Sequence, residues 1–385
     1  MVLAEYDQEL SKIVAELNRA APSQKAAARL PQSTATLDQL LEFAARRNAS
    51  DILLIAGAPA VLRVNGALAP SSGPPLEPED VRACVLPLLE PSQLEELQRR
   101  KSVDLGFERE GIGRFRVNLH HQRGTLAASI RLLPSRIPSL ESLHLPSSLA
   151  RLAERRQGLV LVTGPTGCGK TSTLAALIDI VNTRRAAHVV TIEDPIEYQH
   201  VNRSAIIEQI EVGRDTPDFG VTLRSVMRQT PDVILVGEMR DPETIATALT
   251  AAETGHLVLS TLHTNDAIQA VGRVLDSFPT MNQPQIRQQL SLALLAIVAQ
   301  QLVPGADSVM RWPATEIMIA SDAVRALIRK GDDHQLRSQI SVGKSEGMMT
   351  MEQSLAELVR AGRITRETAF AHCFRSDDLS RYVGA

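Results

Sequence analysis

The sequence predicts an α/β protein whose core is a parallel sheet covered by helices on both faces, with a small α+β domain before it and a helical region after it. Three observations predict this arrangement. Short apolar strands alternate with helical stretches in the middle of the chain, alternating polar and apolar residues precede them, and the last forty residues have helical periodicity. The 385 residues are enough for two or three domains.

Residues 1–35 combine a short helical pattern with a small, polar run, APSQKAAARLPQST. We expect an appended helix and a flexible linker in this N-terminal extension. The segment carries no motif that indicates a function.

Residues 36–135 are expected to form the small α+β domain on an antiparallel sheet. A helix beginning at Leu37 leads into the strands DILLIAG and VLRVNG, and a Pro-rich loop at 69–79 and a helical stretch at 81–98 follow. Alternation then returns in VDLGF, GRFRVNLHHQ and GTLAASIRLL, which are separated by glycine-containing turns. These hairpin-like strands predict antiparallel pairing.

The core domain is expected over residues 151–345, after a Pro-rich interdomain linker at 136–150. Its strands GLVLVTG, HVVTIED, PDVILVGE and GHLVLST are short, apolar and rich in β-branched residues. Strands of this kind are typical of a parallel sheet buried on both faces. Residues 346–385, which include LAELVRAGRITRETAFAHC, are expected to form a helical C-terminal subdomain.

Composition and charge exclude several classes of protein. With 44% hydrophobic and 22% charged residues, the chain has the composition of an ordinary soluble globular protein. Aromatic residues make up only 3% and the net charge is −3, so we expect no nucleic-acid binding, which depends on stacking platforms and cationic surfaces. Cys84, Cys168 and Cys373 stand far apart, which argues against a disulfide framework or a Cys-rich zinc module and fits a reducing cytosol.

No stretch of the sequence reaches the length and apolarity needed to cross a bilayer, and the N-terminus does not resemble a secretory signal. The most apolar run, LSLALLAIV at 290–298, is flanked by glutamines, and we expect it to be a buried helix. Direct membrane insertion is therefore not expected. A protein of this kind that works at a membrane must dock onto something already there.

The strongest motif is GPTGCGKT at 164–171, a GxxxxGK[ST] pattern between an apolar strand and a helical run. The glycines of such a loop expose backbone N–H groups, and the helix N-terminus points at phosphates. Lys170 is expected to reach the β- and γ-phosphates of ATP, and the Thr171 hydroxyl to bind Mg²⁺. Cys168 either makes the activity sensitive to oxidation or is simply a small residue that fits. The expected nucleotide-binding residues are Gly164, Pro165, Thr166, Gly167, Cys168, Gly169, Lys170, Thr171 and Ser172.

A second motif, PDVILVGEMRD, is an apolar strand followed closely by Glu238. A carboxylate at the C-terminal end of a parallel strand lies beside the phosphate loop. There Glu238 is expected to polarise or orient the attacking water. The alternative is an acid that only caps the next helix.

Two more clusters follow predicted strands. TIEDPIE places Glu193, Asp194 and Glu197 where they either hold Mg²⁺ and position water or merely decorate a turn. GHLVLSTLHTN ends near His263, which either responds to the γ-phosphate or is structural.

Arginines are concentrated on the N-terminal sheet. Arg114 and Arg116 alternate on one face of GRFRVN, and Arg123 and Arg131 flank the next strand. They either form a solvated face or supply charge to a nucleotide bound by a neighbouring subunit. We favour the second interpretation.

Together these four blocks resemble the secretion ATPase superfamily. GPTGCGKT corresponds to its Walker A motif, TIEDPIEY to its Asp box, PDVILVGEMRD to a Walker B motif with Glu in place of the usual Asp, and GHLVLSTLHTN to its His box. Over roughly residues 36–370 the chain is similar to the branch of type IV pilus retraction ATPases. The assembly ATPases commonly carry a tetracysteine zinc site, and its absence here favours the retraction branch.

The resemblance implies a RecA-like P-loop ATPase domain that follows a PAS-like N-terminal domain. It also implies a homohexamer on the cytoplasmic face of the inner membrane, at the pilus base. The ring would dock on an inner-membrane pilus platform protein and act indirectly on the pilin fibre. Its ATP turnover would drive pilus retraction.

The resemblance further implies roles for single residues. Lys170 and Thr171 would bind ATP with Mg²⁺, and Glu193 would support the metal, partly through water. Glu238 would activate water, while His263 would couple the nucleotide state to domain position. The residues implied to reach a nucleotide at a subunit boundary are Arg116, Arg131, Arg114 and Arg123.

The sequence departs from the family pattern at three places. Ala326 stands where the retraction enzymes usually have Asn, Thr230 stands where an acidic residue is common, and residues 1–35 are additional. An accessory retraction paralogue and a type II secretion or pilus assembly ATPase stay open as alternatives. A RecA-like DNA translocase and a non-hydrolysing scaffold are more distant ones.

Overall fold

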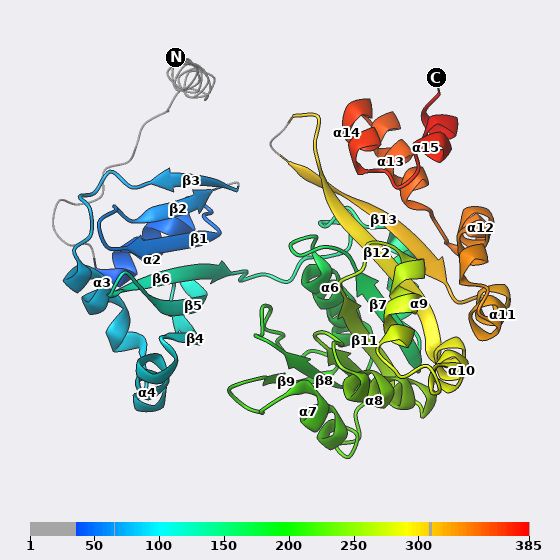
Figure 1. Ribbon diagram of the computed structural model, residues 1–385, viewed down its shortest axis with the longest axis horizontal. Coiled ribbons are helices and arrows are strands. Elements are labelled where there is room, and N and C mark those ends of the chain that lie inside the picture. The colour runs from blue at the N-terminus through cyan, green and yellow to red at the C-terminus, as the bar shows by residue number, and fades with distance from the viewer. Residues whose placement is uncertain (1–35, 65, 308–309, 385) are drawn as a thin grey trace, which may run out of the picture. The chain divides into compact units, whose positions relative to one another are not determined.

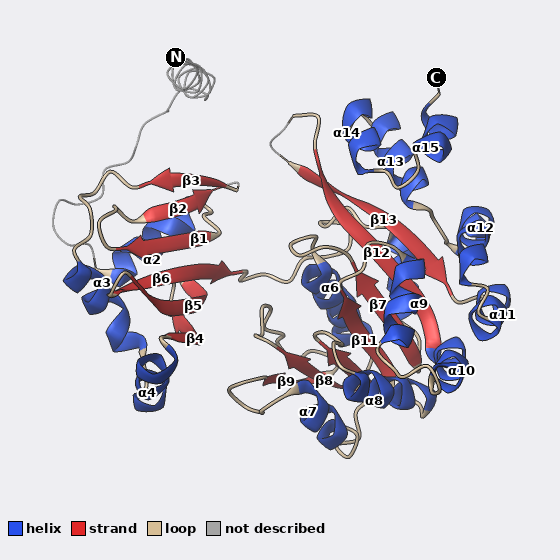
Figure 2. Ribbon diagram, viewed as in Figure 1, coloured by secondary structure: helices blue, strands red, loops and turns tan. Residues whose placement is uncertain are grey.

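The computed structural model describes residues 36–64, 66–307 and 310–384. The helix and linker predicted for residues 1–35 lie outside the described residues. The chain divides into two compact units, with the boundary between Leu133 and Pro134. Figures 1 and 2 show a strand-rich first unit and a second unit in which strands and helices alternate.

The first unit is a six-stranded antiparallel sheet with helices packed on one face. In order across the sheet, its strands are β3 (Ala67–Pro70), β2 (Val61–Val64), β1 (Asp51–Ile55), β6 (Thr125–Leu133), β5 (Gly113–Gln122) and β4 (Ser102–Arg109). Its helices are α2 (Leu37–Arg46), α3 (Pro78–Val85) and α4 (Pro91–Arg100).

Strand β5 shows how alternation builds this unit. Phe115, Val117 and Leu119 are buried in the core that the helices cover, whereas the intervening Arg114 and Arg116 lie on the opposite face. The predicted small α+β domain with an antiparallel sheet is therefore confirmed.

Two local predictions in this unit were wrong. The helical stretch at 81–98 is interrupted, because Pro87 lies in a short 3-10 turn and Pro91 begins a new helix, α4. The Pro-rich segment 69–79 is not all loop, since its first two residues complete β3 and its last two begin α3.

The second unit is built on a seven-stranded sheet. In order, its strands are β13 (Arg311–Ile319), β12 (Leu294–Pro304), β7 (Gly158–Thr163), β11 (Leu257–Leu262), β10 (Val233–Val236), β8 (His188–Glu193) and β9 (Ile206–Glu211). All neighbours pair in parallel except β13, which is antiparallel to β12. The predicted α/β class is confirmed, with the correction that the sheet is mixed at this edge.

Helices cover both faces of this sheet. Those of the second unit are α5 (Ala150–Ala153), α6 (Lys170–Arg184), α7 (Phe219–Val226), α8 (Pro242–Glu253), α9 (Ala267–Asp276), α10 (Gln283–Ala293), α11 (Asp322–Lys330), α12 (Leu336–Val342), α13 (Met351–Arg360), α14 (Arg366–His372) and α15 (Ser376–Val383).

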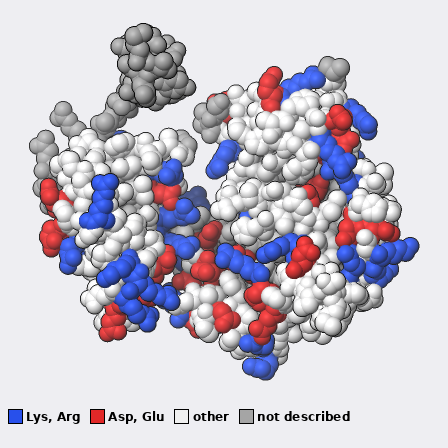
Figure 3. Space-filling view, in the orientation of Figure 1, with Lys and Arg blue, Asp and Glu red and all other residues white. Residues whose placement is uncertain are grey.

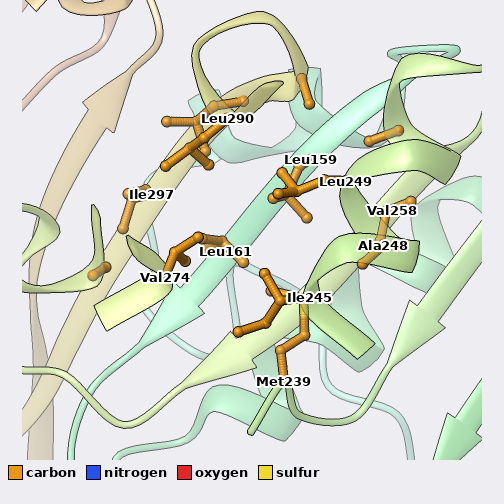
Figure 4. Close-up of a cluster of buried hydrophobic side chains, with 14 of the residues drawn as sticks. Leu159, Leu161, Met239, Ile245, Ala248, Leu249, Val258, Val274, Leu290 and Ile297 are labelled. Atoms are coloured by element: carbon orange, nitrogen blue, oxygen red, sulfur yellow. The ribbon is translucent and has the colours of Figure 1, made fainter. Parts of the chain in front are cut away.

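Strand β7 faces two separate cores. Leu159 and Leu161 pack with α7 to α12, and Figure 4 shows them beside side chains of α8 and α9. Val160 and Val162, on the other face, pack with α6 and with the segment before β7. A strand with no polar face is what a fully covered parallel sheet requires.

The buried helix predicted for 290–298 was only partly right. Helix α10 ends at Ala293, and the rest of the run enters the sheet as β12, between β7 and β13. An uninterrupted apolar run has the same pattern in a buried helix and in a buried strand, so periodicity did not separate them.

The segment expected as a linker, 136–150, contributes to the second unit's core. Leu140, Leu145 and Leu149 are buried there with α6. The helical C-terminal region is confirmed: α13, α14 and α15 pack on the distal end of the β12–β13 ribbon, around Trp312 (Figure 1).

No helix within the described part of the chain is long and apolar enough to cross a membrane. On the face drawn in Figure 3, basic and acidic side chains are interspersed, and a broad area near the centre of the second unit carries neither.

Candidate active site

Four neighbouring parallel strands of the second unit end at one edge of its sheet. In the order β7, β11, β10, β8, they are paired so that Thr163 lies opposite Leu262, and Val236 lies opposite both Ser260 and Ile192. The carboxyl ends of parallel strands in an open α/β sheet form the usual ligand crevice. Each motif singled out in this part of the sequence follows one of these four strands.

The glycine-rich loop leads from β7 into α6. Gly164, Gly167 and Gly169 all have positive φ angles, which favour glycine. At Gly164 a Cβ would also lie 2.1 Å from the backbone oxygen of Gln300, so no larger residue fits there. The loop tip around Thr166 is exposed, which leaves the start of α6 open to an anion.

Lys170 is the first residue of α6 and bends back over the loop. Its Nζ donates hydrogen bonds to the backbone oxygens of Gly164, at 2.8 Å, and Pro165, at 3.1 Å. Burial lowers the pKa of its ammonium group from the ordinary value, and the nearby Glu238 and Glu197 carboxylates act in the opposite direction. The ammonium group is thus held at the loop by two neutral backbone acceptors.

Glu238 and His263 lie side by side at the ends of β10 and β11. The Glu238 Oε2 is 3.4 Å from the His263 Nε2 and 2.7 Å from the Nε of Arg240. The Glu238 side chain is only 15% exposed, whereas those of His263 and Arg240 are 47% and 73% exposed. The carboxylate is therefore mostly buried, and the two groups paired with it are more exposed than it is.

Glu193, the last residue of β8, is buried and oriented by its neighbours. Its Oε1 accepts hydrogen bonds from the Thr191 hydroxyl, at 2.7 Å, and from the Gln209 side-chain amide, at 3.1 Å. Both bonds hold the carboxylate in a fixed direction.

Ser172, on α6, takes part in another contact, a hydrogen bond of 2.8 Å between its hydroxyl and that of Tyr198.

The ends of three of these strands, β7, β11 and β10, are tied to one another by threonine hydroxyls. The Thr163 hydroxyl donates to the Thr264 backbone oxygen, at 2.5 Å, and accepts from the Thr264 N–H, at 3.0 Å. The Thr261 hydroxyl donates to the Gly237 backbone oxygen, at 2.6 Å. The loop after β7, the His263 segment and the Glu238 segment therefore form one connected network.

Cys168 is buried inside the loop, and burial raises the pKa of its thiol from the ordinary value. A thiol kept neutral and covered is poorly reactive. Of the two interpretations of this residue, the structure favours a small side chain that fits.

The residues expected to hold Mg²⁺ fit a metal bound mainly by phosphates and water. Thr171 stands directly after Lys170 at the start of α6, and Glu193 supplies a carboxylate at the same sheet edge. Among the described residues, no group of three His, Cys, Asp or Glu side chains is arranged to hold a metal ion alone. Mg²⁺ at phosphate sites needs only one or two protein ligands.

Sequence reasoning missed three polar side chains of this site. Arg240 pairs with Glu238, Gln209 orients Glu193, and Gln300 contacts the glycine-rich loop through the Cys168 backbone oxygen. Arg240 is part of the PDVILVGEMRD motif and stands two residues after Glu238, so the sequence alone could have indicated that it lies near the site. Gln209 and Gln300 lie far from any motif, and only the sheet order brings them to the site.

The four predicted arginines belong to the first unit. Arg116 and Arg131 are directly opposite each other on β5 and β6, with Asp51 next in the row. Arg131 pairs with Asp51 at 2.9 Å, and Arg116 lies 3.9 Å from Asp104. Arg114 is on the same face of β5.

Arg123 lies apart from this row, in the turn between β5 and β6, where it is exposed. Arg114, Arg116 and Arg131 therefore lie on strands, whereas Arg123 lies in a hairpin turn.

A family model described as "Type II/IV secretion system protein" matches residues 123–364. The chain is 43% identical over 333 residues to the type IV pilus retraction ATPase PilT of Pseudomonas aeruginosa, an alignment that covers 86% of this chain and 96% of the relative. It is 41% identical over 342 residues to the type IV pilus ATPase PilU of the same organism, covering 89% and 90%. A crystal structure titled as the pilus retraction motor PilT with bound ADP superimposes with a TM-score of 0.84 at 42% identity, over 90% of this chain and 99% of that one.

Proposed function

This chain belongs to the family of type II/IV secretion system proteins, and on that premise we propose that it is an ATP-hydrolysing motor that powers the retraction of type IV pili. The resemblance inferred from the four sequence blocks is thereby confirmed at the level of the family.

One observation carries the enzymatic part of the proposal. Four adjacent parallel strands bring the glycine-rich loop, His263, Glu238 and Glu193 to a single sheet edge, although Gly164 and His263 are about 100 residues apart in the sequence. This arrangement places a phosphate cradle beside a candidate base and a candidate metal-supporting carboxylate, which is the set that nucleotide hydrolysis needs.

The loop and α6 would bind the phosphates of the nucleotide. The backbone N–H groups at the start of α6 are aligned toward the open loop tip, and the helix dipole favours negative charge there. Lys170 would exchange its two backbone acceptors, at 2.8 and 3.1 Å, for phosphate oxygens. The exchange replaces neutral acceptors by charged ones and so favours binding.

Thr171 and Glu193 would hold Mg²⁺, whose charge would stabilise the phosphate oxygens. Glu238 would accept the proton of the attacking water, since its carboxylate lies close enough to Lys170 of the loop to act on that residue's pKa. His263 and Arg240, both within 3.4 Å of that carboxylate, would set its orientation.

We further propose that the protein works as a homohexamer on the cytoplasmic face of the inner membrane, at the pilus base and docked on a pilus platform protein. Arg116 and Arg131, with Arg114 on the same face and Arg123 in the β5–β6 turn, would reach the nucleotide of a neighbouring subunit. Two arginines directly opposite each other on paired strands repel; Asp51 and Asp104 offset part of that repulsion, and an anion bound between the arginines would offset the rest. This pairing supports an anion-facing role.

An accessory role beside another retraction motor is the second candidate. The identity to the relative named type IV pilus ATPase PilU is 41%, against 43% for the retraction ATPase, so similarity alone separates the two only weakly. The two functions share the same chemistry and differ in the task performed in the cell.

The enzymatic assignment is tested by Glu238→Gln. The amide keeps the size of the side chain but cannot accept a proton, so we expect nucleotide affinity to stay within about threefold and turnover to fall by about 10²-fold or more. Nucleotide affinity and phosphate release are measured on the purified protein. Glu253→Gln, at the opposite end of α8, is the control and should hydrolyse ATP like the wild type; normal turnover in the Glu238 variant would remove that residue from catalysis.

The biological assignment is tested by deleting the gene in its host and counting surface pili. Loss of a retraction motor leaves pili that are extended and never withdrawn, so we expect more pili and no twitching. Bald cells would instead indicate an assembly ATPase. Cells whose pili still retract, but with less force, would indicate the accessory role.

A further inference from the structure

Gln300 lies directly beneath the nucleotide-binding loop, on β12. Strand β12 pairs with β7 up to the partners Ala299 and Thr163. One residue later β7 gives way to the loop, while β12 continues, so Gln300 faces the loop instead of a strand. Its side chain is buried, with 3% of the residue exposed.

The side chain of Gln300 holds both ends of the turn that leads into α6. Its Nε2 donates to the backbone oxygen of Cys168 at 2.8 Å, and its Oε1 accepts from the hydroxyl of Thr173 at 2.9 Å. The backbone oxygen of Gln300 fills the space that a side chain at Gly164 would need. The loop is thus supported at its beginning and at its end by one residue.

The direction of the Cys168 carbonyl matters for phosphate binding. In a trans peptide the C=O of one residue and the N–H of the next point in opposite directions. Because the Cys168 oxygen is held toward Gln300, the N–H of Gly169 points away from β12. Without that bond the peptide can rotate, which would replace a donor by an acceptor at a site that must attract anions.

We propose that Gln300 is a positioning residue that keeps the loop in its phosphate-binding conformation; this inference rests on the proposed nucleotide-binding function. Gln300 is buried against the loop, so its contribution is expected to fall on nucleotide affinity and not on the chemical step. The neighbouring Gln301 is a natural contrast, because its Nε2 donates to the backbone oxygen of His372, at the end of α14, at 2.8 Å.

The test compares Gln300→Met with the matched control Gln301→Met, since Met has nearly the same length and volume but makes neither hydrogen bond. Binding of a fluorescent ADP analogue with Mg²⁺ and the KM and kcat for ATP are measured on the full-length protein. For Gln300→Met we expect Kd and KM to rise about tenfold, with kcat at saturation within about twofold of wild type. For Gln301→Met we expect nucleotide affinity like that of the wild type.

The outcomes separate this inference from the proposed function. A wild-type protein that binds no nucleotide would contradict the proposed function itself. A wild type that binds, together with a Gln300→Met variant that binds equally well, would overturn only the role of Gln300, even if the variant melts at a lower temperature. An equal loss of affinity in both variants would also overturn it.

A second variant keeps the test decisive if Gln300→Met does not fold. Thr173→Val has the same shape as the wild-type residue but cannot donate to Gln300, at 2.9 Å, or to the Gly169 backbone oxygen, at 3.1 Å. Thr173→Ser retains the hydroxyl and is its control. We expect about a threefold rise in Kd for Thr173→Val and no change for Thr173→Ser. Wild-type affinity in Thr173→Val would contradict the inference. In the double variant with Gln300→Met, the two effects should be non-additive because they remove the same contact.

Discussion

Glu316 is a buried carboxylate whose charge depends on pH near neutrality. It lies on β13, 1% exposed, and its Oε1 accepts a hydrogen bond of 2.9 Å from the N–H of Ala267, the first residue of α9. Burial raises its pKa to about 7, the Ala267 N–H lowers it, the Asp266 and Glu352 carboxylates raise it and Arg337 lowers it. Because α9 begins four residues after His263, this carboxylate contacts an element that adjoins the candidate active site.

The raised pKa predicts a stability change between about pH 4.5 and 7. The folded protein binds the proton more tightly than the unfolded chain, so the stabilisation is present below pH 4.5 and is lost as the pH rises through 7. From pH 5 to 8 the wild type should lose on the order of 2 kcal/mol more than Glu316→Gln, whose amide still accepts the Ala267 bond. Melting temperatures of both proteins across this range measure the difference. The exposed Glu346→Gln should behave like the wild type, and parallel curves for Glu316→Gln would contradict the prediction.

At the residue scale, the sequence predicted the groups that belong to contiguous motifs. Lys170, Glu238 and His263 each follow a strand within a few residues, so their common edge follows from parallel pairing alone. Gln300 was out of reach, because its place depends on β12 lying next to β7, and strand order is decided by long-range packing. Arg240 was within the motif, yet its direction depends on a side-chain pairing that the pattern does not contain.

The glycine-rich loop allows a prediction at the scale of an element. Gly164 and Gly167 both have positive φ, at 144° and 78°. A Cβ at Gly164 would meet the Gln300 oxygen at 2.1 Å, whereas nothing lies within 4 Å of one at Gly167. Gly164→Ala should therefore destabilise the protein by several kcal/mol, and Gly167→Ala by only about 1 kcal/mol.

Thermal unfolding of the two alanine variants measures this contrast. Gly272→Ala, inside α9 and with open space around its Cβ position, is a control that should not destabilise the protein. Equal melting temperatures for the Gly164 and Gly167 variants would show that the contact between the loop and β12 is looser than the structure indicates.

Elements with a clear period or cap were predictable, and uninterrupted apolar runs were not. Strand β5 coincides with the predicted GRFRVNLHHQ because Phe115, Val117 and Leu119 alternate with polar residues. The run at 290–298 has no polar face in either conformation, and the change from α10 to β12 at Leu294 is imposed by the place between β7 and β13. Pro87 and Pro91 divide the stretch at 81–98, because a proline inside a helix removes a backbone hydrogen bond; these two residues are visible in the sequence.

At the scale of the whole molecule, the arginine row predicts that turnover depends on assembly. Arg116→Ala and Arg131→Ala should lower ATP turnover at least tenfold in the assembled oligomer, because a trans-acting guanidinium stabilises charge in the transition state. The nucleotide affinity of the isolated subunit should stay nearly unchanged. Turnover is measured against protein concentration, with the exposed Arg99→Ala on α4 as control; an equal loss of affinity in subunit and oligomer would argue against a trans role.

The sheet order also has a consequence for how the chain folds. Strand β12 lies next to β7, yet about 130 residues separate the two in sequence. Until β12 has left the ribosome, one edge of β7 is unpaired and the loop after β7 lacks its contacts with Gln300. Long-range pairings of this kind form late, because loop closure must precede them. Nucleotide should therefore bind only near the end of folding. Its binding would indicate that the second unit is fully folded and would not nucleate the core.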